Sequence, residues 1–295
     1  MKIIVTHTSP DLDAITSVWL IKRFLNGWEN AVVKYVPAGS RINLSSEMIS
    51  PEDYLEPIEN IGEDEVIHVD TGLGALDHHQ TQSDKVCGAS LTFDFVRKNS
   101  QIKEEKIPAL ERIVNYVVWD DHFKQVFRPD PAADYHELEL DGILEGLKYE
   151  NPGQDDLFVD FIMKCLDAVM YNFESRIWAE KEIEEKGSEF TIKAGQVLAI
   201  ETLNDSVIKL AQLRGIALVI RKDPKSGNAR IKASPKAEID LTKAYDELKK
   251  KDPKASWFLH VGKRMLLNGT SKNPKMVPTK LTLSEMSDVI KQIYG

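Results

Sequence analysis

The way the chain begins places the strongest constraint on its fold. Residues 2–7, KIIVTH, form a short run rich in β-branched side chains, and residues 13–28 carry apolar side chains at helical spacing. The polar segment HTSPDLD joins the two, so His7, Asp11 and Asp13 lie where the strand gives way to the helix. Open parallel sheets place their ligand sites at the carboxyl ends of strands. The opening therefore predicts a strand, a polar site and a helix.

The same arrangement recurs further along the chain. Residues 31–39, AVVKYVPAG, predict a second strand, and residues 64–72, DEVIHVDTG, predict a third that ends at Asp70. Helices are predicted over residues 89–100, 106–123 and 157–186. Alternating strands and helices favour an α/β fold, with a parallel sheet in a three-layer N-terminal domain.

The long helix over residues 157–186 has a charged second half, which favours a spacer between two domains. Beyond Gly187 strands and helices intermix again in a smaller α/β layer. A chain of 295 residues is long enough for two cores, because single cores stop growing near ~250–300 residues. We expect a domain over residues 1–187 and a second over residues 188–295, with the active site in the cleft between them.

Composition excludes several classes of protein. A net charge of -9 argues against a surface that coats itself with nucleic acid, but it leaves room for a local basic groove. The only two cysteines, Cys87 and Cys165, argue against a disulfide framework and fit a reducing compartment. No apolar run approaches the ~18 residues of a membrane span, and the N-terminus does not resemble a secretion signal. We therefore expect a cytoplasmic location and no membrane partner.

The segment VDTGLGALDHHQ, residues 69–80, places two adjacent histidines behind an aspartate. Other carboxylates and imidazoles fall at predicted strand or helix ends. The full set is His7, Asp11, Asp13, Asp70, Asp77, His78, His79 and Asp120 or Asp121. Hard divalent cations such as Mn²⁺ and Mg²⁺ take such ligands, and two ions ~3.5–4 Å apart need a bridging carboxylate. The set is large enough for two ions.

Each of these residues also has a structural explanation. Ser9 or Asp11 could cap the first helix, and Asp70 with Gly72 could make a turn. Four separate segments carry Asp or His at the same topological end, which favours a metal site over a set of unrelated caps. His68, inside a predicted strand, is instead expected to be structural.

Four segments resemble the motifs of the DHH phosphoesterase superfamily, and they occur in its order. They are HTSPDLDA, Asp70 in VIHVDTG, LDHHQ, and the aspartate of VVWDDHF. This resemblance covers the first ~185 residues. The glutamine after DHH and the segment SWFLHVGKR of the second domain are similar to the MYG1-like branch. The first motif is also similar to family II inorganic pyrophosphatases.

The resemblance implies a role for each matching residue. It implies six ligands for two manganese ions: His7 and Asp11 for one, Asp13, His78 and Asp120 for the other, and Asp70 as the bridge. Asp120 is preferred to Asp121 as the ligand of the fourth motif. His79 would contact substrate or donate a proton, and Asp77 would orient the histidines. Mg²⁺ and Co²⁺ are the alternative ions.

The second domain offers cationic side chains for an anionic substrate. They are Arg230, Lys232, His260, Lys263, Arg264 and Lys272. His260 is the strongest candidate, because it lies at a predicted strand end before Gly262, where backbone can approach a ligand closely. We expect Arg230, His260, Lys263 and Arg264 to bind substrate.

The function expected from these features is a manganese-dependent phosphoesterase. Its substrate would be a phosphodiester or phosphomonoester of a nucleotide or short oligonucleotide, as in a 3′-5′ exonuclease. One alternative is a phosphoanhydride hydrolase similar to inorganic pyrophosphatase. Another is a module that binds metal without turnover.

Overall fold

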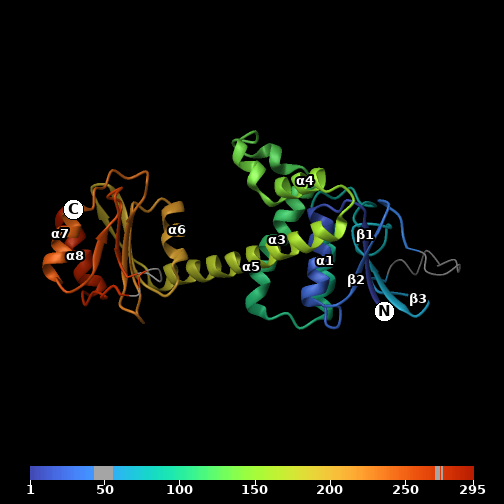
Figure 1. The fold of residues 1–295 in the computed structure, drawn as a ribbon, viewed down its shortest axis with the longest axis horizontal. Helices are drawn as coiled ribbons and strands as arrows, with labels where there is room; N and C mark the ends of the chain where they lie inside the picture. The colour runs from blue at the N-terminus through green and yellow to red at the C-terminus, as the bar shows by residue number, and fades with distance from the viewer. Residues whose placement is uncertain (43–55, 270–272, 274) are drawn as a thin grey trace. The chain divides into compact units, whose positions relative to one another are not determined.

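The protein, described here by a computed structural model over residues 1–42, 56–269, 273 and 275–295, forms two compact units. Unit 1 is Met1–Glu174 and unit 2 is Ser175–Gly295 (Figure 1). The division falls within helix α5, Asp155–Lys186, so the helix contributes to both. Both units combine strands and helices, which confirms the expected α/β class.

Unit 1 contains a four-stranded sheet in the order β2-β1-β4-β3. Its strands are β1 Lys2–His7, β2 Val32–Val36, β3 Glu59–Ile61 and β4 Asp64–His68. Strand β1 pairs in parallel with both β2 and β4, whereas β3 is antiparallel to β4. The three strands that the sequence predicts thus form the parallel part of the sheet.

Apolar side chains from all four strands pack on one another. Ile3 and Val5 of β1 form a cluster with Val36, Ile61 and Val66, and all five are at most 8% exposed. Alternate side chains of a strand point to the same face, so this cluster covers one face of the sheet. Its burial fixes the register of β1 against its neighbours.

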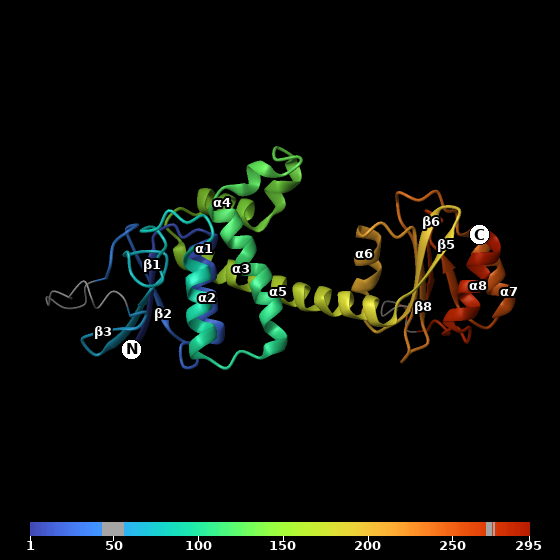
Figure 2. The ribbon, with the colours of Figure 1, turned by 180° about the vertical axis from the view of Figure 1, so that it is seen from behind.

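The helices of unit 1 are α1 Leu12–Phe24, α2 Gly88–Asn99, α3 Ile107–Asp121 and α4 Leu140–Glu150. Single 3₁₀ turns lie at Glu104–Lys106, Lys124–Phe127 and Asp134–Leu138. Helix α1 packs against both α2 and α3, and α1 and α2 run side by side in Figure 2. The Asp11 side chain caps α1 by accepting from the Ala14 N–H. This packing brings the N-termini of α1 and α2 to the carboxyl ends of β1 and β4.

Unit 2 contains a six-stranded sheet in the order β5-β6-β7-β8-β10-β9. Its strands are β5 Ser188–Ile192, β6 Gly195–Glu201, β7 Leu218–Lys222, β8 Ala229–Ala233, β9 Trp257–Leu259 and β10 Met265–Asn268. Its helices are α6 Ser206–Leu213, α7 Thr242–Lys251 and α8 Leu283–Tyr294. Strands β7 and β8 are antiparallel and form a hairpin.

Helices cover both faces of the second sheet. In β6, Val197 and Ala199 pack with α7 and α8, whereas Leu198 and Ile200 pack with α6. A strand buried on both faces carries a continuous apolar run, as the residues VLAI of β6 do. Figure 1 shows α6 on one side of this sheet and α8 on the other.

Three strands escaped the sequence analysis. Strand β3 has only three residues, β5 is largely exposed, and β10 is a four-residue run, MLLN, that follows two basic residues. Short or polar strands carry little periodicity, and their pairing with neighbours decides their structure. Within the described residues, no helix combines the length and apolar character needed to cross a membrane.

Candidate metal centre

The register of β1 and β4 brings His7 and Asp70 together. Val5 lies opposite His68, so His7 and Asp70, each two residues further on, emerge at the same sheet edge. His7 Nε2 lies 3.3 Å from Asp70 Oδ2 and 3.7 Å from Asp11 Oδ2. The other ring nitrogen, Nδ1, donates to the Thr8 carbonyl and fixes the ring. This is the first cluster of candidate ligands.

Asp70 itself is held in an unusual conformation. Its φ of 51° lies in the left-handed region, which non-glycine residues seldom adopt. The Asp70 N–H donates to the Leu76 carbonyl, so the loop that follows folds back on β4. Only 2% of Asp70 is exposed. Strained residues of this kind persist where the surrounding structure holds them, and they are concentrated at functional sites.

The first histidine of the DHH segment forms a second cluster on the other side of Asp70. His78 Nε2 lies 3.5 Å from Asp70 Oδ1, 3.5 Å from Asp121 Oδ2 and 3.8 Å from Asp13 Oδ2. Asp70 therefore offers one carboxylate oxygen to the neighbourhood of His7 and the other to that of His78. This is the arrangement that a bridging carboxylate requires.

Asp13 is held by the N-terminus of α2. The Gly88 N–H donates to Asp13 Oδ2 and the Ala89 N–H to Asp13 Oδ1, at 2.7 and 2.6 Å. The positive end of a helix dipole favours a carboxylate at this position. Asp13 is 2% exposed, and the two N–H groups hold its carboxylate in place.

The second histidine, His79, is held by Asp77. Asp77 Oδ1 accepts from both His79 Nδ1, at 2.7 Å, and the His79 N–H, while Asp77 Oδ2 accepts from the Leu73 N–H. The His79 side chain is 58% exposed, in contrast to buried Asp77. The structure thus brings Asp77 and His79 together, and the His79 ring is the more accessible of the two side chains.

Asp120 and Asp121 point to different surroundings. Asp121 Oδ2 faces His78 Nε2, whereas the Asp120 carboxylate accepts from Gln125 Nε2. The two are adjacent at the end of α3, so their side chains are turned about 100° apart around the helix. The geometry supports Asp121 in the place that the motif comparison gave to Asp120.

Contacts with neighbouring aspartates control the charge of His7 and His78. Burial disfavours charge on His7, but contacts with Asp11 and Asp70 outweigh it and raise the pKa of His7 to about 10. Contact with Asp70 likewise outweighs burial and raises the pKa of His78 to about 9. Both imidazoles are therefore cationic near neutral pH when no metal is bound.

Several carboxylates of the cluster repel one another. Burial, followed by the charges of Asp70 and Asp11, raises the pKa of Asp13 well above its usual range. Burial also raises the pKa of Asp121. Carboxylates held this close in a dry site are destabilising unless positive charge offsets them. The site favours an added cation.

Two polar atoms fit a cation directly. Asp70 Oδ1 and His78 Nε2 are buried and have no hydrogen-bond partner. Buried polar atoms are normally satisfied, so an orphaned pair facing each other indicates a missing partner. A divalent ion is bound by a carboxylate oxygen and an imidazole nitrogen. The residues present therefore fit one or two hard divalent cations.

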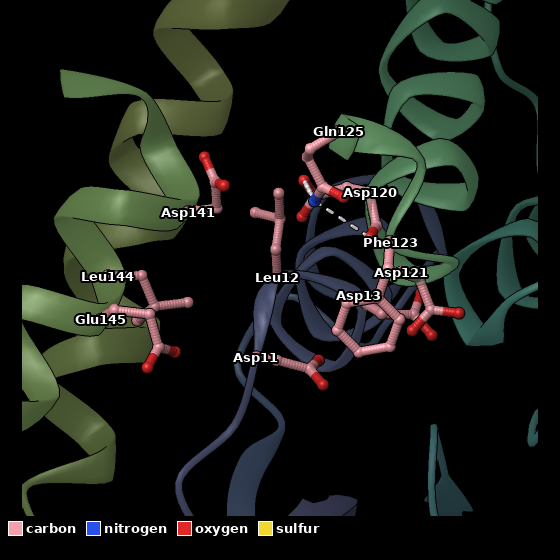
Figure 3. A pocket seen from close by; sticks show the side chains of 10 residues that line it. All are labelled: Asp11, Leu12, Asp13, Asp120, Asp121, Phe123, Gln125, Asp141, Leu144 and Glu145. Atoms are coloured by element: carbon pink, nitrogen blue, oxygen red, sulfur yellow. Dashed lines mark hydrogen bonds between the residues drawn. The ribbon is translucent and has the colours of Figure 1, made fainter. Parts of the chain in front are cut away.

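A cavity of about 260 Å³ opens beside the cluster (Figure 3). Three of the candidate ligands, Asp11, Asp13 and Asp121, line it. The remaining lining residues are Leu12, Asp120, Phe123, Gln125, Asp141, Leu144 and Glu145. Burial and the neighbouring charge of Asp141 raise the pKa of Asp120 to about 6. The cavity thus joins the candidate ligands to a wall that is partly apolar and partly acidic.

The substrate-binding candidates of unit 2 are only partly gathered. His260, Lys263 and Arg264 are exposed in the turn between β9 and β10. The Arg230 guanidinium lies on β8 and pairs with Asp205 at 2.8 Å. Lys263 Nζ lies 3.3 Å from Asp240. Lys232 lies on β8 opposite Met265, and Lys272 falls outside the described residues.

The structure also reveals residues that the sequence analysis did not select. His122 Nε2 donates to the Val86 carbonyl and lies 3.8 Å from Asp121 Oδ2. His122 directly follows the two aspartates in VVWDDHF, and this adjacency was the available signal. His68 is buried with Glu59 and accepts from the Ile42 N–H. His68 thus has the structural role that its position in a strand predicts.

Comparison with known proteins yields weak likenesses. No family model matches the chain, and no curated protein matches it. Among solved structures, an uncharacterized protein from Helicobacter pylori G27 shares 13% identity at a TM-score of 0.26, covering 100% of this chain and 99% of that one. The pGpG-specific phosphodiesterase PggH from Vibrio cholerae shares 12% identity at 0.28, covering 98% of each chain.

A Methanococcus jannaschii protein assigned to the family II inorganic pyrophosphatases shares 14% identity at a TM-score of 0.23. The alignment covers 98% of this chain and 99% of that one. TM-scores this low do not establish a common fold or activity. The function must therefore be argued from the residues of the site.

Proposed function

We propose that the protein is a metal-dependent phosphohydrolase whose active site lies at the candidate metal centre of unit 1. One observation carries the proposal: Asp70 lies between His7 and His78, with one carboxylate oxygen facing each. A second supports it, because Asp70 Oδ1 and His78 Nε2 are buried without a partner. Two cations sharing a carboxylate are a common arrangement for phosphoryl transfer.

The candidate ligands form two sets around Asp70. His7, Asp11 and Asp70 would hold one ion, and Asp13, Asp70, His78 and Asp121 would hold the other. Mn²⁺ suits this mixture of carboxylates and imidazoles, with Mg²⁺ and Co²⁺ as alternatives. Such ions would lower the pKa of a bound water and would neutralise the oxygens of a phosphate.

His79 supplies the proton-transfer group. Its Nδ1–H donates to Asp77, which leaves Nε2 as the atom that exchanges a proton with substrate. The ring is 58% exposed, so a leaving group at the rim of the site can reach it. Asp77 acts by fixing this tautomer and the direction of the ring.

The cavity favours an organic phosphoester over inorganic pyrophosphate. Leu12, Phe123 and Leu144 give part of its wall an apolar character beside the candidate ligands. Pyrophosphate has no apolar group to place there, whereas a nucleotide has a base and a sugar. We propose a nucleotide or short oligonucleotide as substrate. We also propose Arg230, His260, Lys263 and Arg264 as the phosphate-binding residues of unit 2.

The test is hydrolysis by protein stripped with a chelator and then supplied with Mn²⁺. The panel contains pyrophosphate, a 3′-phosphorylated nucleotide, a cyclic dinucleotide and short RNA. Asp70→Asn should abolish turnover, whereas Asp94→Asn, a matched change at an exposed position of α2, should not. Equal rates for Asp70→Asn and the wild type would contradict the proposal. Cleavage of pyrophosphate alone would favour the phosphoanhydride alternative.

A further inference from the structure

Gly88, the first residue of α2, lies against two candidate ligands at once. A Cβ at this position would lie 2.9 Å from Asp13 Oδ2, 2.9 Å from Asp70 Cβ and 3.3 Å from Asp70 Cα. Contacts of 2.9 Å essentially never occur for a real Cβ, so any side chain would force a shift. The helix end can approach these aspartates only because residue 88 is glycine.

The close approach of α2 also allows hydrogen bonds to Asp13. With α2 this close, the N–H groups of Gly88 and Ala89 reach separate oxygens of the Asp13 carboxylate. Each carboxylate oxygen has a second lone pair, so both remain able to bind a cation. The same helix end packs on the Asp70 backbone, where φ is 51°. The position of α2 therefore bears on both Asp13 and Asp70.

The first turn of α2 has little freedom to retreat. The Ser90 hydroxyl donates to the Cys87 carbonyl and accepts from the Cys87 N–H, which closes the turn on itself. Cys87, Gly88 and Ala89 are all buried. Packing at this density transmits a displacement to neighbouring groups instead of absorbing it.

We propose that Gly88 is a positioning residue that sets the spacing of Asp13 and Asp70 for metal binding, an inference that rests on the proposed metal site. Gly88 acts through the two aspartates and does not itself touch the ion. A side chain here would push the helix end away from Asp13 or displace the Asp70 backbone. Loss of such an outer contact usually lowers metal affinity about 10–100-fold.

The experiment measures the dissociation constant for Mn²⁺ by calorimetry, with the full chain as wild type and as Gly88→Ala. Gly146→Ala is the matched control, because it lies in α4 and a Cβ there would meet no atom within 4 Å. We expect Gly88→Ala to bind Mn²⁺ about 10–100-fold more weakly and Gly146→Ala to bind as the wild type does. Thermal unfolding without metal, followed by circular dichroism, is recorded for each protein.

A purely structural role would give a different pattern. In that case Gly88→Ala would unfold at a lower temperature without metal and would bind Mn²⁺ with wild-type affinity, which overturns the inference. If Gly88→Ala does not fold, Ala89→Pro replaces it, since proline is tolerated in a first helical turn and removes the N–H bonded to Asp13. The same 10–100-fold loss is then expected, and wild-type affinity in that variant would overturn the inference.

The failure of the inference is distinguishable from failure of the proposed function. A wild-type protein that binds no Mn²⁺ would overturn the metal site itself, and the role of Gly88 with it. A wild type that binds Mn²⁺ and hydrolyses a phosphoester, beside a Gly88→Ala variant of equal affinity, would overturn only the role of Gly88.

Discussion

Asp121 Oδ2 lies 3.5 Å from His78 Nε2, while the neighbouring Asp120 accepts a hydrogen bond from Gln125. We expect Asp121→Asn to lower phosphoester turnover about 100-fold or more, because it removes a candidate ligand. Asp120→Asn should retain most activity. Turnover and Mn²⁺ affinity of the two isosteric variants, measured side by side, decide between them. The reverse ranking would restore Asp120 as the ligand.

Metal binding should release protons. The pKa of His7 is raised to about 10 and that of His78 to about 9, so both imidazoles carry a proton at pH 7.5 in the absence of metal. Each imidazole that binds the metal must lose one of its two ring protons, so we expect release of about two protons. Calorimetry of Mn²⁺ binding in buffers of different ionisation enthalpy measures this number. Heats that do not depend on the buffer would argue against ligation by these histidines.

Asp77→Asn should weaken the site without removing a ligand. The carboxylate fixes His79 and also accepts from the Leu73 N–H. Asparagine keeps the shape but offers a single acceptor oxygen and can reverse the tautomer of His79. We expect about a tenfold or greater loss of kcat with a smaller change in Mn²⁺ affinity. An unchanged pH profile of kcat would exclude a proton-transfer role for His79.

Unit 2 should lose stability in acid through Asp252. Burial opposes charge on this residue, but bonds from the Lys280 N–H and the Thr279 hydroxyl outweigh it and hold the pKa of Asp252 below its ordinary value of 3.8. A group with a depressed folded pKa stabilises the protein above the unfolded value and loses that contribution as pH falls through the folded one. The loss therefore occurs below about pH 4.

We expect Asp252→Asn to destabilise unit 2 at pH 7 by about 1 kcal/mol or more, and to flatten its stability below pH 4. Asp246→Asn, at an exposed position of α7, is the control. Amide hydrogen exchange across residues 252–281 reports this unit alone. Parallel stability curves for Asp252→Asn and the wild type between pH 2 and 5 would contradict the assignment.

Local patterns were sufficient to predict most of the fold. The apolar run KIIVTH and the helical spacing after it predict β1 and α1, because both elements bury most of their residues. The pairing of β10 with β8, by contrast, joins residues far apart in the sequence. Such pairing depends on the partner strand, and no local pattern of MLLN specifies it.

Some residues of the candidate site can likewise be identified from local sequence, whereas others depend on tertiary packing. His7, Asp70 and His78 could be selected from the sequence because each ends a strand or lies in a short polar motif. The choice between Asp120 and Asp121 could not be made, because it depends on how α3 is rotated toward His78. The role of Gly88 depends on how closely α2 approaches Asp13, a distance that only tertiary packing sets.

Asp11 serves two purposes, since its Oδ1 caps α1 while its Oδ2 faces His7. A relative of this protein that binds no metal would still gain stability from an aspartate, serine or asparagine at this position, because each of these side chains can cap a helix. His78 Nε2 has no hydrogen-bond partner, so this nitrogen has no comparable structural role. Among relatives of unknown activity, a histidine at the place of His78 is therefore the better marker of a working site, and an aspartate at the place of Asp11 the poorer one.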